Sequence, residues 1–70
     1  MILYVTKQQA RALELFGNGM AVKDIALTLG VSYQRVVNIL NEILARTPFS
    51  SKRELLANIK NIELEEKKEQ

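Results

Sequence analysis

The side chains that could carry chemistry in this 70-residue chain are amides rather than nucleophiles or general acids and bases. The sequence has no histidine and no cysteine, and Asp24 is its single aspartate. Histidine and cysteine are the commonest catalytic bases and metal ligands, so we expect no enzyme, no cofactor and no metal site. Gln34, Asn38 and Asn41, in contrast, recur at a spacing that places them on one face of a helix.

These three amides suit the recognition of DNA bases. A carboxamide donates and accepts at the same time, and this pair of groups matches the N6 and N7 edge of adenine in the major groove. Tyr33 and Val37 fall on the same outward side of the segment and offer apolar contact, for example with a thymine methyl. We therefore expect base contacts from all five residues. The alternative is a solvated helix face without a partner, because exposed amides are common on surface helices.

A helix, a tight turn and a second helix are expected to position this row. Apolar spacing predicts helices over 22–29 and 32–46. Gly30 between them can adopt the positive φ that ends a helix, and Ser32 is a favoured N-cap residue. Ala26 is small enough for the two backbones to approach closely at their crossing. This order is typical of a helix-turn-helix, and the alternative is an ordinary helical hairpin.

The rest of the chain is expected to add one helix on each side of this unit. Thr6 with Gln9, and Ser51 with Glu54, have the spacing of capping boxes at helix starts. Seventy residues form one small domain, here expected over 1–64. The prediction is an all-α, four-helix fold with helices about 6–18, 22–29, 32–46 and 51–64, followed by a charged, frayed tail at 65–70.

The charge of the chain is uneven. Residues 1–62 hold eight Lys or Arg against four Asp or Glu, whereas residues 63–70 hold four Glu against two Lys. A basic excess of this size is compatible with phosphate binding. The cations expected at DNA phosphates are Lys23, Arg35, Arg46 and Lys52.

No run approaches the roughly 20 apolar residues of a membrane span, so we expect no association with a membrane and a location in the cytoplasm.

Several short strings of the sequence together match the pattern of a known family. They are Val5-Thr6 and Gly19, Lys23-Asp24-Ile25-Ala26, Leu29, Val31 and Ser32, Val36 and Ile43, and Phe49-Ser50-Ser51-Lys52. On these positions the string from Val5 to Leu56, about three quarters of the chain, resembles the LuxR-type (FixJ- or GerE-like) DNA-binding domain of bacterial transcription regulators. One departure concerns the segment that carries the amides, where Val37 stands in place of a lysine usual in that family.

The resemblance implies a bacterial or bacteriophage transcription regulator that binds duplex DNA as a homodimer. In that family the fourth helix carries the two-fold contact, which here implies a dimer or partner surface made by Leu56, Asn58, Ile59 and Ile62. The alternative is an interaction module that binds another LuxR-type regulator, or RNA polymerase, without specific DNA binding. The apolar Val37 and Ile39 are compatible with that alternative.

Overall fold

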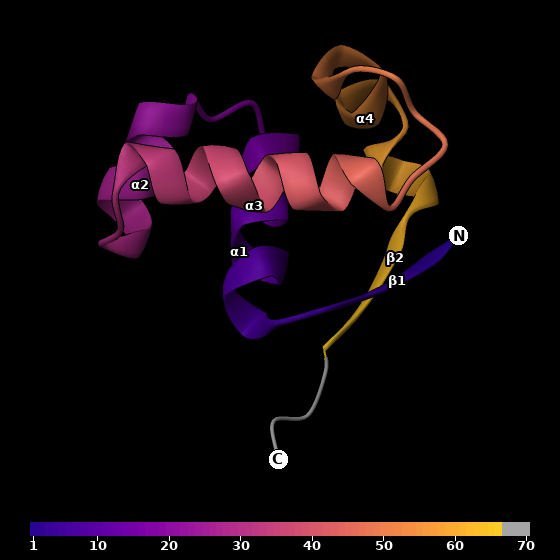
Figure 1. The fold of residues 1–70 in the computed structure, drawn as a ribbon, viewed down its shortest axis with the longest axis horizontal. Coiled ribbons are helices and arrows are strands. Elements are labelled where there is room, and N and C mark those ends of the chain that lie inside the picture. Colours follow the sequence, from indigo (N-terminus) through magenta and orange to yellow (C-terminus); the bar gives the residue numbers. More distant parts are fainter. Residues whose placement is uncertain (67–70) are drawn as a thin grey trace.

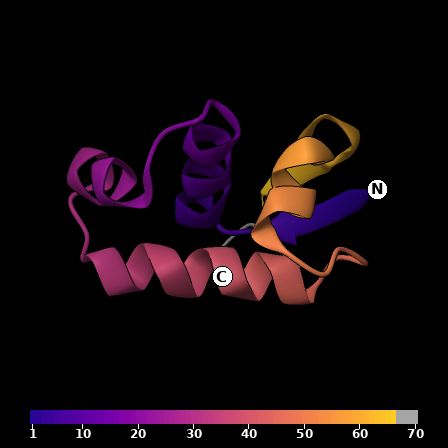
Figure 2. The same ribbon diagram turned by 90° about the horizontal axis from the view of Figure 1, so that it is seen from above.

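One long helix forms one side of the molecule, and the remaining elements pack on its inner side (Figures 1 and 2). In this computed structural model the described residues are 1–66. The elements in chain order are β1 (Ile2–Val5), α1 (Lys7–Gly17), α2 (Val22–Leu29), α3 (Tyr33–Ala45), α4 (Lys52–Ala57), the short 3₁₀ helix η1 (Ile59–Asn61) and β2 (Glu63–Glu66). The first three helices lie where the sequence predicts them.

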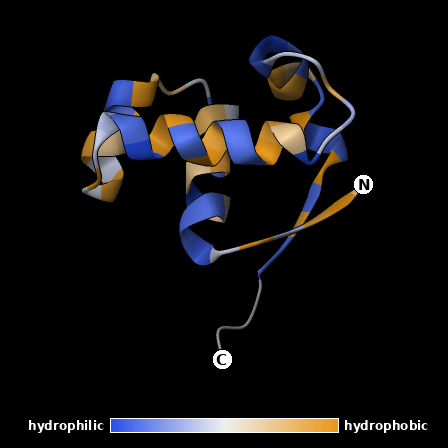
Figure 3. Cartoon of the chain, in the orientation of Figure 1, coloured by the Kyte–Doolittle hydropathy of each residue, from blue (hydrophilic) through white to orange (hydrophobic). Residues whose placement is uncertain are grey.

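The core is built around the inner face of α3. Val36, Ile39, Leu40 and Ile43 recur at helical spacing, and all four are fully buried. The alternation of apolar and polar stripes along α3 is visible in Figure 3. The other buried residues come from α1, α2, α4 and β1: Leu3, Val5, Ala12, Leu13, Ile25, Ala26 and Leu55.

The expectation of an all-α fold is wrong, because the two ends of the described chain form a parallel two-stranded sheet. The register pairs Ile2 with Glu63, Leu3 with Leu64, Tyr4 with Glu65 and Val5 with Glu66. Leu3 and Val5 face the core while Ile2 and Tyr4 face solvent, the alternation of a half-buried strand. Two isolated strands are marginally stable, so the packing of this buried face on the helices must hold them in place.

The expected fourth helix over 51–64 is also wrong, because α4 ends at Ala57. The Asn58 side chain donates from Nδ2 to the Glu54 carbonyl, at 2.9 Å, and this bond satisfies a carbonyl of the last turn. The chain then makes one 3₁₀ turn and enters β2. The helical spacing at 55–62 does not produce a helix to residue 64, because the half-buried Leu64 packs on the core in an extended strand beside Leu3.

The predicted tail boundary at residue 65 falls inside β2, since Glu65 and Glu66 pair with β1. The remainder of that predicted tail, residues 67–70, lies outside the described residues. No helix formed by residues 1–66 has the length and apolar character needed to cross a membrane.

Candidate nucleic-acid interface

The turn between α2 and α3 has the geometry that its residues predict. Gly30 follows α2 with φ 70°, in the left-handed region that glycine adopts without steric cost. The Val31 N–H donates to the Ala26 carbonyl at 3.0 Å, which closes the turn. The Ser32 hydroxyl then accepts from the Arg35 N–H at 3.0 Å and caps α3. The start of α3 is thereby fixed against the end of α2.

The three amides predicted to read bases lie on the outer side of α3, opposite its buried face. Gln34, Asn38 and Asn41 are exposed, and Tyr33 beside them is 57% exposed. The Gln34 Nε2 donates to Asn38 Oδ1 at 3.0 Å, so these two side chains hold each other in place. An amide has further donors and acceptors, so this bond leaves both residues able to meet a base edge.

The two apolar residues singled out on this helix differ in their accessibility. Val37 is half-buried at the margin of the outer face, so it presents only part of its side chain to a ligand. Ile39 is fully buried in the core. Of these two residues, only Val37 is therefore accessible to a partner, and Ile39 serves the core.

The four cations predicted at phosphates do not lie together. Arg35 donates from Nε to Gln8 Oε1 at 3.1 Å, beside the first turn of α1. Arg46, just beyond the end of α3, donates from Nη2 to the Tyr4 carbonyl and so ties α3 to β1. Lys23 is exposed near the start of α2, whereas Lys52 is half-buried on α4, beside the far end of α3 (Figure 1). Only Arg35 combines an exposed position with a neighbouring amide of the outer face.

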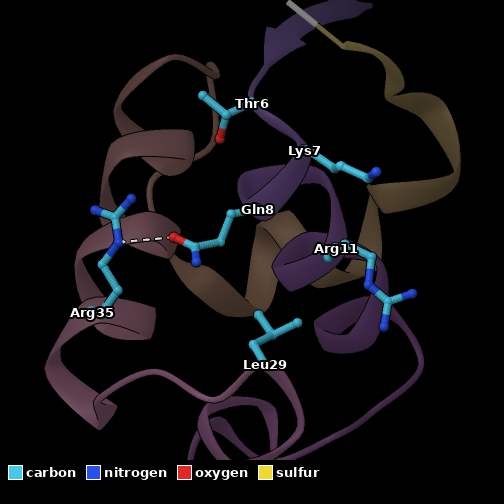
Figure 4. Close-up of a pocket in the computed structure, with 6 residues that line it drawn as sticks. All are labelled: Thr6, Lys7, Gln8, Arg11, Leu29 and Arg35. Carbon is cyan, nitrogen blue, oxygen red and sulfur yellow. Dashed lines mark hydrogen bonds between the residues drawn. The ribbon is translucent and has the colours of Figure 1, made fainter.

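Two cations that sequence reasoning missed lie across Gln8 from Arg35 (Figure 4). Lys7 and Arg11 of α1 line an open hollow of about 530 Å³ together with Arg35 (Figure 4). The other lining residues are Thr6, Gln8 and Leu29, so the hollow lies where α1, the end of α2 and the start of α3 meet. The four-residue spacing of Lys7 and Arg11 indicates one face of a helix, but nothing local in sequence indicates that Arg35 lies beside it.

The residues predicted as a dimer surface do not form one helix face. Leu56 is 38% exposed on α4, but Asn58 caps that helix. Ile59 is half-buried against α1, where a Cβ added at Gly17 would lie 2.8 Å from Ile59 Cδ1. Ile62 is half-buried and also packs on the core. Three of the four residues therefore serve contacts within the chain.

The outer face of the sheet has the opposite charge to the hollow beside α3. Glu63 and Glu65 of β2 are exposed next to Ile2 and Tyr4 of β1, and Glu66 beside Val5 is also exposed at the end of the strand. Carboxylates in this number repel a phosphate backbone. This part of the surface is thus unsuited to nucleic acid, while the side that bears Arg35 remains suited to it.

The chain matches no protein-family model, no curated protein and no solved structure.

Proposed function

We propose that the chain binds duplex DNA through α3. The observation that carries this proposal is the row of Gln34, Asn38 and Asn41, exposed on a helix whose start is fixed by Gly30 and Ser32. The major groove is about 12 Å wide and 8.5 Å deep, which admits one α-helix. A helix entering the groove by its first three turns would bring all three amides to base edges.

The chemistry of each contact follows from the side chains. Asn38 and Asn41 would pair with adenine N6 and N7, and Gln34, bonded to Asn38, would extend the row toward the start of the helix. The exposed ring of Tyr33 and the accessible part of the Val37 side chain would contact thymine methyl groups. A protein that reads DNA in this way would act on transcription in the cytoplasm of a bacterium, or of a phage-infected cell.

The second candidate is an interaction module that holds another protein. The observation in its favour is the exposed apolar surface of the helix-turn-helix, where Leu27 is 77% and Tyr33 57% exposed. A partner would cover such side chains, whereas DNA would cover the amides. The two candidates therefore differ in which residues of the same unit must be intact.

The test is selection from pooled genomic duplex fragments at about 150 mM salt, followed by sequencing of the retained fraction. The Asn38→Ala, Asn41→Ala double variant should lose the enriched sequence, with affinity for that sequence falling about 10–100-fold. The matched control is Asn18→Ala with Asn61→Ala, since both of these asparagines are exposed and lie outside α3.

If the double variant still retains the same enriched sequence, α3 does not read the bases. Retention without any enrichment would favour the second candidate. Capture of another transcription regulator or of RNA polymerase by the wild-type chain would then test it, with Leu27→Ser as the negative control, because Leu27 is exposed and is not among the proposed DNA contacts. An inverted repeat among the selected sequences would report binding by two copies, and a single short site would report binding by one.

A further inference from the structure

A second surface beside α3 has the chemistry of a phosphate contact. The hollow lined by Thr6, Lys7, Gln8, Arg11, Leu29 and Arg35, which we call the α1–α3 hollow, carries three cations, and its six described lining residues include no carboxylate. The glutamate of α1, Glu14, lines a different hollow. Three positive side chains without a carboxylate among the lining residues make the α1–α3 hollow attractive to an anion.

The arrangement of the hollow suits an extended anion rather than a single small ion. Gln8 lies in its middle, with Arg35 on one side and Lys7 and Arg11 on the other (Figure 4). Lys7 and Arg11 are four residues apart in sequence, so they form a short row along α1. Cations spread in this way fit successive phosphates of one strand.

The guanidinium of Arg35 is held in place and keeps donors for a phosphate. Its Nε is engaged by Gln8 Oε1 at 3.1 Å, which fixes the direction of the guanidinium. A guanidinium has five N–H donors, so the terminal nitrogens keep donors for a phosphate. The bond to Gln8 thus orients Arg35 without exhausting its binding capacity.

The position of the hollow relative to the amide row identifies the ligand. Arg35 follows Gln34 directly, on the flank of α3 that faces α1. A duplex whose major groove receives Gln34 and Asn38 has a backbone strand running along each flank of the inserted helix. We infer that the α1–α3 hollow binds the phosphodiester backbone of duplex DNA, with Lys7, Arg11 and Arg35 as the contacting residues; this inference rests on the proposed function.

The test compares a Lys7→Gln, Arg11→Gln double variant with a matched control, Arg53→Gln with Lys60→Gln. Both variants remove two exposed positive charges, but Arg53 and Lys60 lie outside the α1–α3 hollow. Affinity for duplex DNA is measured against salt concentration, with the selected sequence and with an unrelated duplex. Circular dichroism confirms that each variant is folded.

The expected result is a loss of affinity that is the same for both duplexes, about tenfold at low salt, with the enriched sequence unchanged. The slope of log K against log salt should fall by about 2, because each phosphate contact contributes roughly 0.9. The control variant should show a smaller change in that slope.

The outcomes separate this inference from the proposed function. Selective binding with equal salt slopes in the two variants would overturn the hollow as a phosphate site and leave base recognition by α3 standing. Unselective binding that depends on Lys7 and Arg11 would support the hollow and overturn sequence recognition. No binding of wild type to either duplex would overturn both.

Discussion

The segment from α2 to α3 and the segment from α4 to β2 use their polar side chains in different ways. On the outer face of α3, Gln34, Asn38 and Asn41 project into solvent. In the later segment, Ser51 and Asn58 bond the local backbone and so define both ends of α4. The outer face of α3 therefore leaves its amides for a ligand, whereas Ser51 and Asn58 serve the fold.

Apolar side chains of both segments serve the core, which takes Ile25 and Ala26 from α2 and four residues from α3. The α4–β2 segment contributes Leu55 to the core and packs Ile59, Ile62 and Leu64 against it. Its end is tied to β1, where the Glu63 N–H donates to the Met1 carbonyl at 2.7 Å. The α4–β2 segment therefore completes the core and the sheet. Because its apolar side chains pack within the chain, it has little surface for a two-fold contact.

The largest expected effect tests whether the α4–β2 segment serves the core, and it comes from the loss of packing around Leu55. Leu55 is fully buried, so Leu55→Ala should lower the free energy of unfolding by about 2–5 kcal/mol. Leu27→Ala is the control. Because Leu27 is 77% exposed, this substitution should change the free energy of unfolding by less than about 0.5 kcal/mol. Urea unfolding measures both. Equal effects of the two substitutions would show that Leu55 is not part of the core.

A smaller effect separates packing within the chain from a dimer contact. Ile59→Glu places a charge in the half-buried contact with Gly17, and should lower the free energy of unfolding by about 1–3 kcal/mol. The loss should be the same at all protein concentrations, because the contact is intramolecular. Thermal unfolding over a wide concentration range measures it. A loss that grows with concentration, together with a change in sedimentation, would restore Ile59 as a partner residue.

A weaker electrostatic effect should appear on the flank of α3. Glu42 is exposed at a helical position between Arg35 and Arg46, so its carboxylate opposes a phosphate strand on that side. Glu42→Gln should raise affinity for duplex DNA about twofold at low salt, and the gain should vanish at high salt. Fluorescence anisotropy at two salt concentrations provides the measurement. Weaker binding after this substitution would place the DNA elsewhere.

The smallest effect concerns acid stability at the start of α4. Hydrogen bonds from the Ser50 hydroxyl, at 2.6 Å, and from the Ser50 N–H lower the pKa of Glu54. A lowered pKa in the folded state stabilises the fold above the ordinary carboxyl value of 4.5, and this contribution disappears as pH falls through the folded pKa. Glu54→Gln should therefore flatten the acid side of a plot of melting temperature against pH. An unchanged profile would show that the Ser50 bonds contribute nothing to stability.

The elements that the sequence predicts well are those specified by neighbouring residues. Thr6 and Gln9 form the expected capping box, Gly30 adopts the expected positive φ, and Ser32 caps α3. Ser51 also accepts from the Glu54 N–H, but the Glu54 carboxylate bonds Ser50 instead of completing the box. Local hydrogen bonding and φ preferences are sufficient for all of these features.

The sheet and the α1–α3 hollow could not be predicted in this way. The spacing of Leu55, Leu56, Ile59 and Ile62 fits a helix, and the alternation of Ile62 and Leu64 fits a strand equally well. The choice is decided by β1, some 60 residues earlier in the chain, which offers a pairing partner. Arg35 likewise meets Gln8 across 27 residues of sequence. Contacts of such range leave no periodic signal.

The most direct test of the division between the two segments is an NMR titration of the ¹⁵N-labelled chain with its selected duplex. The account predicts the largest amide shifts at 33–41 and at 7–11, with residues 52–66 unchanged. Shifts confined to 52–66 would contradict it, because they would place the ligand on the segment that closes the fold.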